Sequence, residues 1–212
     1  MRAFSSILAG LVAGAGILIL HPLLLADHDG QKCIADMALA NERRDACTFV
    51  LARRLLPEDR ARTLAYRGAA LLGMGKEDEA LADFTQALAI TPDLVMALLD
   101  RSLVHARREQ YDAALADLAA VFRAGGDLTD AWAARGYLYF QHGNLVAAAA
   151  DIERLQESDP ENAWAHNISG AIHAQLGDFP KAAAEYRRAV ALAPDDPGFA
   201  DDISRFELGH TP

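Results

Sequence analysis

The sequence predicts an all-α fold built from stacked pairs of antiparallel helices. Three observations lead to this prediction: a period of 34 residues, apolar residues spaced as on one face of a helix, and an alanine-rich composition. Alanine has the highest helix propensity, and its small side chain lets helices approach closely. The 212 residues are 52% hydrophobic and 24% charged, so the chain can bury a substantial core and is not disordered.

The 34-residue period is visible at several kinds of position. A small residue recurs in the expected first helix of each unit: Gly68, Ser102, Gly136 and Gly170. An alanine recurs in the expected second helix: Ala80, Ala114, Ala148 and Ala182. A helix breaker closes each unit: Pro92, Gly126, Pro160 and Pro194. One helix pair cannot bury its own apolar faces, so neighbouring units are expected to stack.

Within a unit the apolar spacing is helical and does not alternate. In the first unit Ala80, Phe84, Ala87 and Leu88 share one face of the second helix. A glycine falls between the two helical runs in three units, where a left-handed residue can end the first helix. These glycines are Gly75, Gly143 and Gly177. Each unit is therefore expected to be a helix, a tight turn and a second helix.

These positions resemble the tetratricopeptide repeat family, in which an aromatic, a glycine and a tyrosine mark the first helix and alanines with an aromatic mark the second. The third unit matches this pattern best, with Trp132, Gly136, Tyr139, Ala148 and Pro160. The resemblance covers roughly residues 61–196. It implies a right-handed α-solenoid of stacked helix-turn-helix repeats.

The period divides the chain into seven segments. The four repeats are predicted at 61–94, 95–128, 129–162 and 163–196. Extending the period backwards predicts a degenerate repeat over 27–60, with helices near Gln31–Ala40 and Arg43–Leu55 and with Pro57 near the breaker position. Residues 197–212 are expected to form a cap helix that solvates the end of the array.

Residues 1–26 are expected to be a signal peptide or a membrane anchor. Arg2 is the single charged residue before Asp27, and residues 7–20 are uninterrupted apolar or small side chains, a layout typical of a secretory signal. Ala26 provides a small residue for cleavage, but the apolar stretch is also just long enough to cross a bilayer. Both alternatives predict an extracytoplasmic protein, in the periplasm, secreted or anchored to the inner membrane. The Ala- and Arg-rich, Lys-poor composition favours a bacterial source.

Two cysteines fall in the degenerate repeat. Cys33 and Cys47 lie on its two helices in facing positions. In an oxidising compartment they are expected to form a disulfide, which would hold together a terminal repeat that has one packed neighbour. Two buried free thiols are the alternative. The spacing is not that of a zinc or redox motif.

Arginine and aspartate recur with the same period. They are Arg67, Arg101 and Arg135, and Asp83, Asp117 and Asp151. We expect the second helix of one repeat to pack on the first helix of the next, which predicts an ion pair between Asp83 and Arg101. It predicts a second pair between Asp117 and Arg135. Ser169 replaces the arginine in the fourth repeat, so Asp151 is expected to lack a partner.

No catalytic motif is present in the sequence, neither GxSxG, HExxH nor a Walker-type loop. The seven histidines form no metal-ligand spacing, and no cofactor is expected. We therefore expect no enzyme activity. An enzyme with a site outside known motifs is the competing hypothesis, and it would require His166, His173 and a carboxylate to converge in a cleft.

The resemblance implies a binding surface on the concave face, which the first helices form. The family binds extended or helical peptides there, and the corresponding positions here form an apolar and aromatic stripe with polar edges. They are Arg62, Leu72, Met96, Leu99, Leu103, Arg107, Asp130, Tyr137, Phe140, Gln141, Trp164, Asn167 and Gln175. For any single position, packing against a neighbouring repeat is the alternative role.

The charge of the chain excludes several classes of partner. A net charge of -10 disfavours binding to duplex nucleic acid or to anionic lipid, both of which require a basic face. Membrane contact is expected only through residues 1–26, if they are not cleaved. The predicted function is a non-catalytic adaptor that binds a protein or peptide partner in the bacterial envelope. The alternative is an anchored structural subunit of an envelope assembly.

Overall fold

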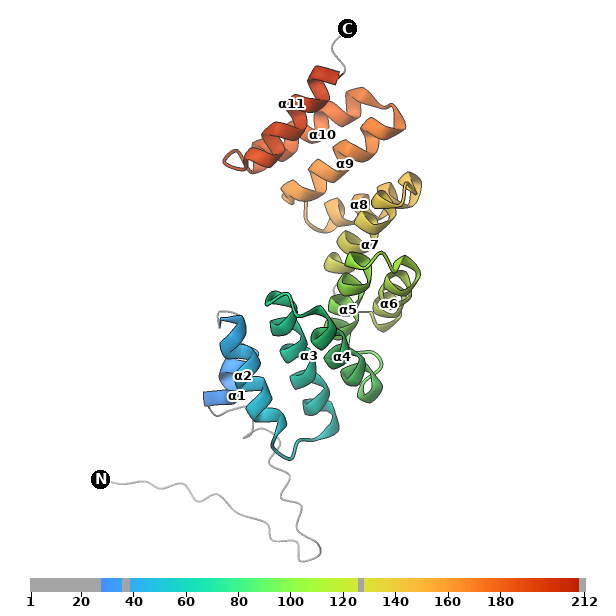
Figure 1. Cartoon of the computed structure of the whole chain (residues 1–212). Helices are drawn as coiled ribbons and strands as arrows, with labels where there is room; N and C mark the ends of the chain where they lie inside the picture. Colours follow the sequence, from blue (N-terminus) through green and yellow to red (C-terminus); the bar gives the residue numbers. More distant parts are fainter. Residues whose placement is uncertain (1–27, 36–38, 126–127, 210–212) are drawn as a thin grey trace, which may run out of the picture.

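The computed structural model describes residues 28–35, 39–125 and 128–209, which form eleven α-helices. The bounds are α1 (His28–Ile34), α2 (Ala40–Leu51), α3 (Pro57–Gly73), α4 (Glu77–Ile90), α5 (Val95–Arg107), α6 (Tyr111–Ala124), α7 (Thr129–Gln141), α8 (Leu145–Ser158), α9 (Ala163–Leu176), α10 (Phe179–Leu192) and α11 (Pro197–Gly209). Consecutive helices pack as pairs that follow one another along the chain (Figure 1). The predicted all-α solenoid of helix pairs is confirmed.

The expected segment 1–26 lies outside the described residues. Within the part of the chain that the structure describes, no helix combines the length and the apolar character that crossing a bilayer requires.

In the four repeats from α3 to α10, the turn between the two helices contains a left-handed residue, and the three glycines predicted at this place are confirmed. Gly75, Gly143 and Gly177 have φ angles of 75°, 74° and 81°. The equivalent position of the second repeat is Glu109, with φ 57°. Residues other than glycine rarely adopt this backbone conformation, because their Cβ then crowds the following carbonyl oxygen. The second repeat therefore forms the same turn with an unfavourable residue.

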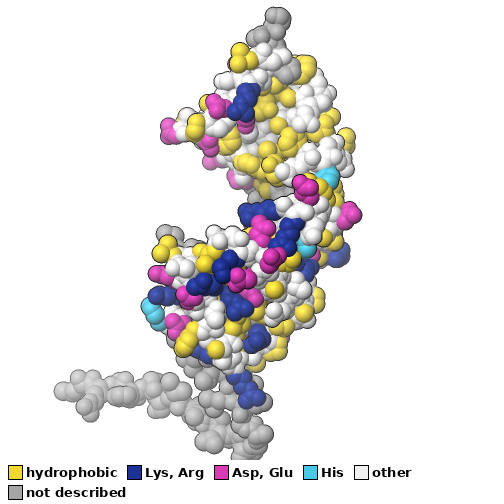
Figure 2. All heavy atoms as spheres, viewed as in Figure 1, with side chains coloured by type: hydrophobic (Ala, Val, Ile, Leu, Met, Phe, Trp, Pro, Cys, Tyr) yellow, Lys and Arg dark blue, Asp and Glu magenta, His cyan; other side chains and the backbone are white. Residues whose placement is uncertain are grey.

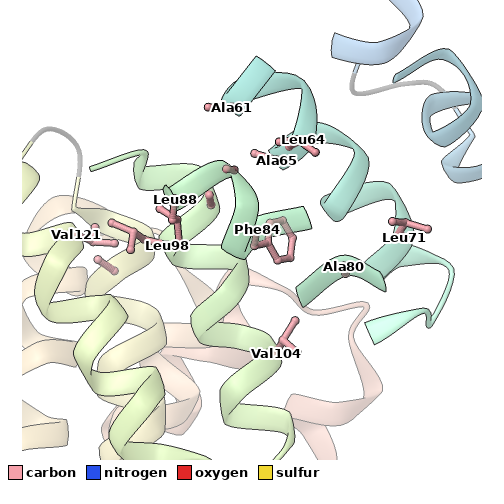
Figure 3. Close-up of a cluster of buried hydrophobic side chains, with 13 residues drawn as sticks. Ala61, Leu64, Ala65, Leu71, Ala80, Phe84, Leu88, Leu98, Val104 and Val121 are labelled. Atoms are coloured by element: carbon pink, nitrogen blue, oxygen red, sulfur yellow. The ribbon is translucent and has the colours of Figure 1, made fainter. Parts of the chain in front are cut away.

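The small residue of each first helix faces the large side chain of its partner helix. A Cβ added at Gly68 would lie 2.6 Å from Cε1 of Phe84, and one at Gly170 would lie 2.9 Å from Cδ1 of Tyr186. The alanines of the second helices are equally enclosed, since Ala80 and Ala148 have no exposed surface. Figure 3 shows Phe84 and its apolar neighbours gathered between the helices. Among the described residues, the buried apolar side chains form four clusters along the array.

The array curves with the first helices on the inside. Successive first helices α3, α5, α7 and α9 contact one another, whereas among the described residues the second helices of successive repeats do not. We call the surface formed by these first helices the concave face. Charged side chains gather over the lower and middle part of the view in Figure 2, and apolar side chains dominate its upper part.

The N-terminal repeat differs from its prediction. α1 begins at His28 and ends at Ile34, and α2 ends at Leu51 instead of Leu55. Pro57 does not close this repeat but begins α3, because a proline is tolerated at the first position of a helix, where its missing N–H has no intrahelical partner. The segment expected to form the cap helix contains α11, which has no fully buried residue.

Candidate functional site

A pocket of about 280 Å³ opens between α5 and α7 on the concave face. Four of the residues predicted to bind a partner line it, two from each of these helices. They are Leu103, Arg107, Tyr137 and Gln141. Leu103 and Tyr137 are 43% and 39% exposed, so two large apolar surfaces face solvent at the mouth of the pocket.

The other residues that line the pocket are ones that the sequence did not assign to the site. They are Ser102, Ala106, Ala114, Leu118, Ala134 and Leu138. Ala106 and Ala134 lie on the two walls, and their small side chains leave the space open. The sequence did contain a sign of this pocket, because the other first helices carry larger residues at the positions equivalent to Ala106 and Ala134. Leu72 and Phe140 stand at the position of Ala106 in the first and third repeats, and Ile168 stands at the position of Ala134 in the fourth.

Aromatic side chains continue the apolar surface from α7 to α9. The ring of Tyr137 lies 5.7 Å from the ring of Trp164 and 6.4 Å from that of Phe140. Trp164 and Phe140 are half-buried and pack against the core formed by α8 and α9. Such amphipathic rings provide a rigid contact area for a partner.

The other predicted binding residues do not form one surface. Met96, Leu99 and Leu72 are half-buried against the core around α3 to α5, and the exposed ones are Arg62, Asp130 and Gln175. Asn167 is 8% exposed, and its Nδ2 donates to Oδ2 of Asp202 on α11 at 2.8 Å. Asn167 therefore packs inside the array instead of facing a ligand.

Two charged residues of α5 differ in their environment. Arg107 lies 3.6 Å from Glu77. Asp100 is half-buried, and among the described residues none forms a hydrogen bond or ion pair with its carboxylate. Burial raises the pKa of Asp100 to about 6, because removing a carboxylate from water disfavours its charged form.

The recurring arginines and aspartates form ion pairs within each repeat, and the predicted pairing across repeats is wrong. Nε of Arg67 lies 2.7 Å from Oδ2 of Asp83. The same two-bond geometry joins the equivalent arginine and aspartate of the next two repeats: Arg101 to Asp117 and Arg135 to Asp151. The aspartates are at most 6% exposed, and their hydrogen bonds raise the pKa of the arginines above the ordinary value.

The reason for the error is the direction in which the arginine points. It lies on the side of the first helix that meets the second helix of the same repeat, 16 residues later. Across the repeat boundary, Arg135 contacts an aromatic ring and not an aspartate: its guanidinium lies 3.8 Å from the centre of the Phe122 ring. Asp151 accordingly has a partner, contrary to the prediction.

In the fourth repeat a different polar cluster occupies this place. Ser169 and Glu185 stand at the arginine and aspartate positions. Nδ1 of His166 lies 2.7 Å from Oε2 of Glu185, and Nε2 of Gln156 donates to the same oxygen at 2.9 Å. His166 therefore bridges α9 and α10, and its interactions are those of a structural residue.

Cys33 and Cys47 face each other between α1 and α2. Both side chains have no exposed surface, their Cα atoms are 4.8 Å apart, and their sulfur atoms lie within bonding distance. Tyr66 of α3 packs against them. The pair thus joins the two helices of the N-terminal repeat where they meet the rest of the array.

Within the described residues, no three His, Cys, Asp or Glu side chains group in a way that could hold a metal ion. The site offers an apolar pocket, aromatic rings and a few charged groups.

Several solved structures share the architecture. A fragment of MamA from Desulfovibrio magneticus RS-1 is 21% identical, with a TM-score of 0.67 over 82% of this chain and 96% of that one. TTC0263, a thermophilic TPR protein of Thermus thermophilus, is 19% identical, with a TM-score of 0.63 over 80% and 91%. YrrB, described as a TPR protein with an unusual peptide-binding site, is 17% identical, with a TM-score of 0.65 over 78% and 84%.

The sequence itself matches two family models, both described as tetratricopeptide repeat. One matches residues 61–94, and the other matches 99–163 and 133–197. No curated protein sequence is similar enough to count as a relative. The matched ranges span well over half of the chain, and the range 61–94 coincides with the first repeat read from the 34-residue period, so the chain belongs to the tetratricopeptide repeat family.

Proposed function

We propose that this protein is a non-catalytic adaptor that binds a peptide or helix of a partner protein on its concave face. The observation that carries the proposal is the pocket between α5 and α7, whose exposed mouth continues into the Tyr137 and Trp164 rings. Apolar pockets beside exposed aromatic rings are typical of sites that anchor a partner's side chain. Proteins of this fold generally bind other proteins, and YrrB is described as having a peptide-binding site.

Photocrosslinking from the pocket tests this proposal. A photoreactive amino acid placed at Leu103 is expected to crosslink to a partner in the producing cell. The matched control is the same residue at Val146, which is 77% exposed on α8 and therefore equally accessible but outside the pocket. We expect one protein to be captured at position 103 and absent at position 146, and Tyr137→Ala to abolish this capture.

The competing proposal, an anchored structural subunit, predicts the reverse result. Crosslinks would then form from position 146 and survive Tyr137→Ala, because the outer helices would make the assembly contacts. An enzyme with a site outside known motifs would instead require a substrate-dependent activity that His166→Ala removes.

We further propose that the protein acts in the bacterial envelope, with residues 1–26 as a signal peptide or an inner-membrane anchor. The single cation and the apolar stretch support this location, as does the facing pair of buried cysteines. N-terminal sequencing of the mature protein distinguishes cleavage from anchoring. Thiol labelling of the denatured, unreduced protein is expected to find no free cysteine, and two free thiols would contradict the disulfide.

A further inference from the structure

We propose that the concave face selects a peptide in which an apolar or aromatic side chain and a cationic side chain are separated by about 10 Å, the usual distance between packed helices. The apolar side chain would enter the pocket between α5 and α7, and the cation would bind the carboxylate of Asp100. This inference rests on the proposed adaptor function and gives the chemistry of the ligand.

The repeat places Asp100 between α3 and α5, at the place equivalent to the pocket. Ala134 lines the pocket from α7, and Asp100 occupies the same position one repeat earlier, on the side of α5 that meets α3. The equivalent α3 positions hold Gly68, Ala69, Leu72 and Gly73, and Leu72 fills part of the space because it packs against the core. Asp100 is nevertheless only half-buried, so part of its side chain is open to a ligand.

The equivalent aspartate at the C-terminal end of the array has a hydrogen-bond donor that Asp100 lacks. Asp202 stands at the same position of the period on α11, and Asn167 of α9 donates to it at 2.8 Å. The residue equivalent to Asn167 on α3 is Ala65, which has no donor. Asp100 is thus a half-buried acceptor whose expected protein donor is missing. A donor from a ligand would restore the interaction that the C-terminal end of the array makes internally.

The acidic charge of the chain favours a cation as that donor. The 212 residues contain 20 Lys and Arg against 30 Asp and Glu. The arginines of α5 are already engaged, Arg101 by Asp117 at 2.6 Å and Arg107 by Glu77 at 3.6 Å. The raised pKa of Asp100 agrees with this assignment, since burial is its first cause and no cation offsets it.

The geometry also sets the spacing of the ligand. The pocket lies between α5 and α7, whereas Asp100 lies on the side of α5 that meets α3, and neighbouring helices are about 8–10 Å apart. An extended peptide covers this distance in about three residues, and a helix covers it in about six or seven. The two anchoring side chains are therefore expected at one of these separations.

The test begins with a phage-displayed library of random dodecapeptides selected on the full chain. We expect the enriched peptides to carry Lys or Arg at one of these separations from an aromatic or aliphatic residue. The best peptide and its Lys→Gln or Arg→Gln counterpart are then titrated against the wild type, Asp100→Asn, Tyr137→Ala and the control Asp93→Asn. Asp93 is exposed between α4 and α5.

Removing the cation is expected to weaken wild-type binding by about tenfold, the effect of a partly buried charge pair. Asp100→Asn should weaken binding of the cationic peptide by a similar factor and leave the neutral peptide unaffected, while Asp93→Asn changes neither. Enriched peptides without a cation, or equal losses for both peptides in Asp100→Asn, would overturn this inference alone. Peptides that still bind Tyr137→Ala normally, or no enrichment at all, would overturn the adaptor function as well.

Discussion

Nδ1 of His166 lies 2.7 Å from Oε2 of Glu185, in the place where the three preceding repeats hold an arginine and an aspartate. The fourth repeat thus replaces an ion pair by a cluster in which Glu185 accepts hydrogen bonds from His166 and Gln156. One carboxylate holds three helices together: α8, α9 and α10.

We predict that Glu185→Ala destabilises the protein by about 1–3 kcal/mol, because it leaves two half-buried donors without their acceptor. Urea unfolding measures this change. Glu161→Ala is the matched control, since Glu161 is exposed between α8 and α9, and a surface change of this kind is usually within about 0.5 kcal/mol. Equal effects of the two substitutions would show that the cluster contributes nothing.

The corrected pairing of the arginines can be tested with a double-mutant cycle. Arg135→Ala leaves the carboxylate of Asp151, which is 6% exposed, without its cation, and should cost about 2–4 kcal/mol because an unpaired buried charge is strongly unfavourable. Combined with Asp151→Ala it should show a coupling energy of about 1–3 kcal/mol. The sequence predicted a pair between Arg135 and Asp117, so Arg135→Ala is also combined with Asp117→Ala, and this coupling energy should be small. A larger coupling energy with Asp117 than with Asp151 would support the pairing across repeats.

The helix pairs could be predicted from the sequence, whereas the partners of the arginines could not. The period identified the four helix pairs from α3 to α10, because a spacing of 34 residues repeated in one phase requires equivalent structures. It also showed that Arg135 and Asp151 recur in step, but not which partner each one meets. The partner of each side chain depends on how its helix is rotated about its own axis. This rotation is the same in every repeat, so a comparison of positions 34 residues apart does not reveal it.

The candidate binding surface was predictable to a similar degree. Leu103 and Tyr137 follow from the positions that the family uses, and both line the pocket between α5 and α7. Asn167 occupies such a position too, yet its amide bonds Asp202, because α11 covers the last repeat. The last repeat is therefore not equivalent to the others, and a role assigned from the repeat position does not hold there.

The turn of the second repeat offers a stabilising substitution. Glu109 has φ 57° where the other repeats have glycine. We predict that Glu109→Gly raises the free energy of unfolding by about 1 kcal/mol, because the left-handed conformation strains residues with a Cβ. Thermal unfolding measures the gain. Glu109→Ala is the control, which removes the charge but keeps the Cβ, and a similar gain in both would attribute the effect to charge.

The fit of Gly68 against Phe84 predicts an overpacking effect. Gly68→Ala brings a Cβ within 2.6 Å of the ring and should cost about 1–3 kcal/mol, more than the helix propensity of alanine returns. Phe84→Leu should reduce the cost of Gly68→Ala, because the second repeat already combines Ser102 with Leu118 at these positions. Additive effects of the two substitutions in urea unfolding would show that the glycine is not required by the ring.

Asp100 gives the stability of the array a specific pH dependence. Its folded pKa of about 6 lies above the ordinary value of 3.8, so between these values the unfolded chain loses its proton first. Ionisation therefore destabilises the folded protein increasingly from about pH 4 to pH 6 and by a constant amount above that, at most about 3 kcal/mol.

Asp100→Asn removes this effect. The variant should be about 2–3 kcal/mol more stable than the wild type at pH 7.5, and the difference should shrink to about 1 kcal/mol at pH 4.5. Urea unfolding at the two pH values measures it, with Asp93→Asn as the exposed control that should change little at either. A difference that stays constant with pH would mean that the carboxylate of Asp100 is solvated, and it would remove the partly buried charge that the proposed cationic ligand needs.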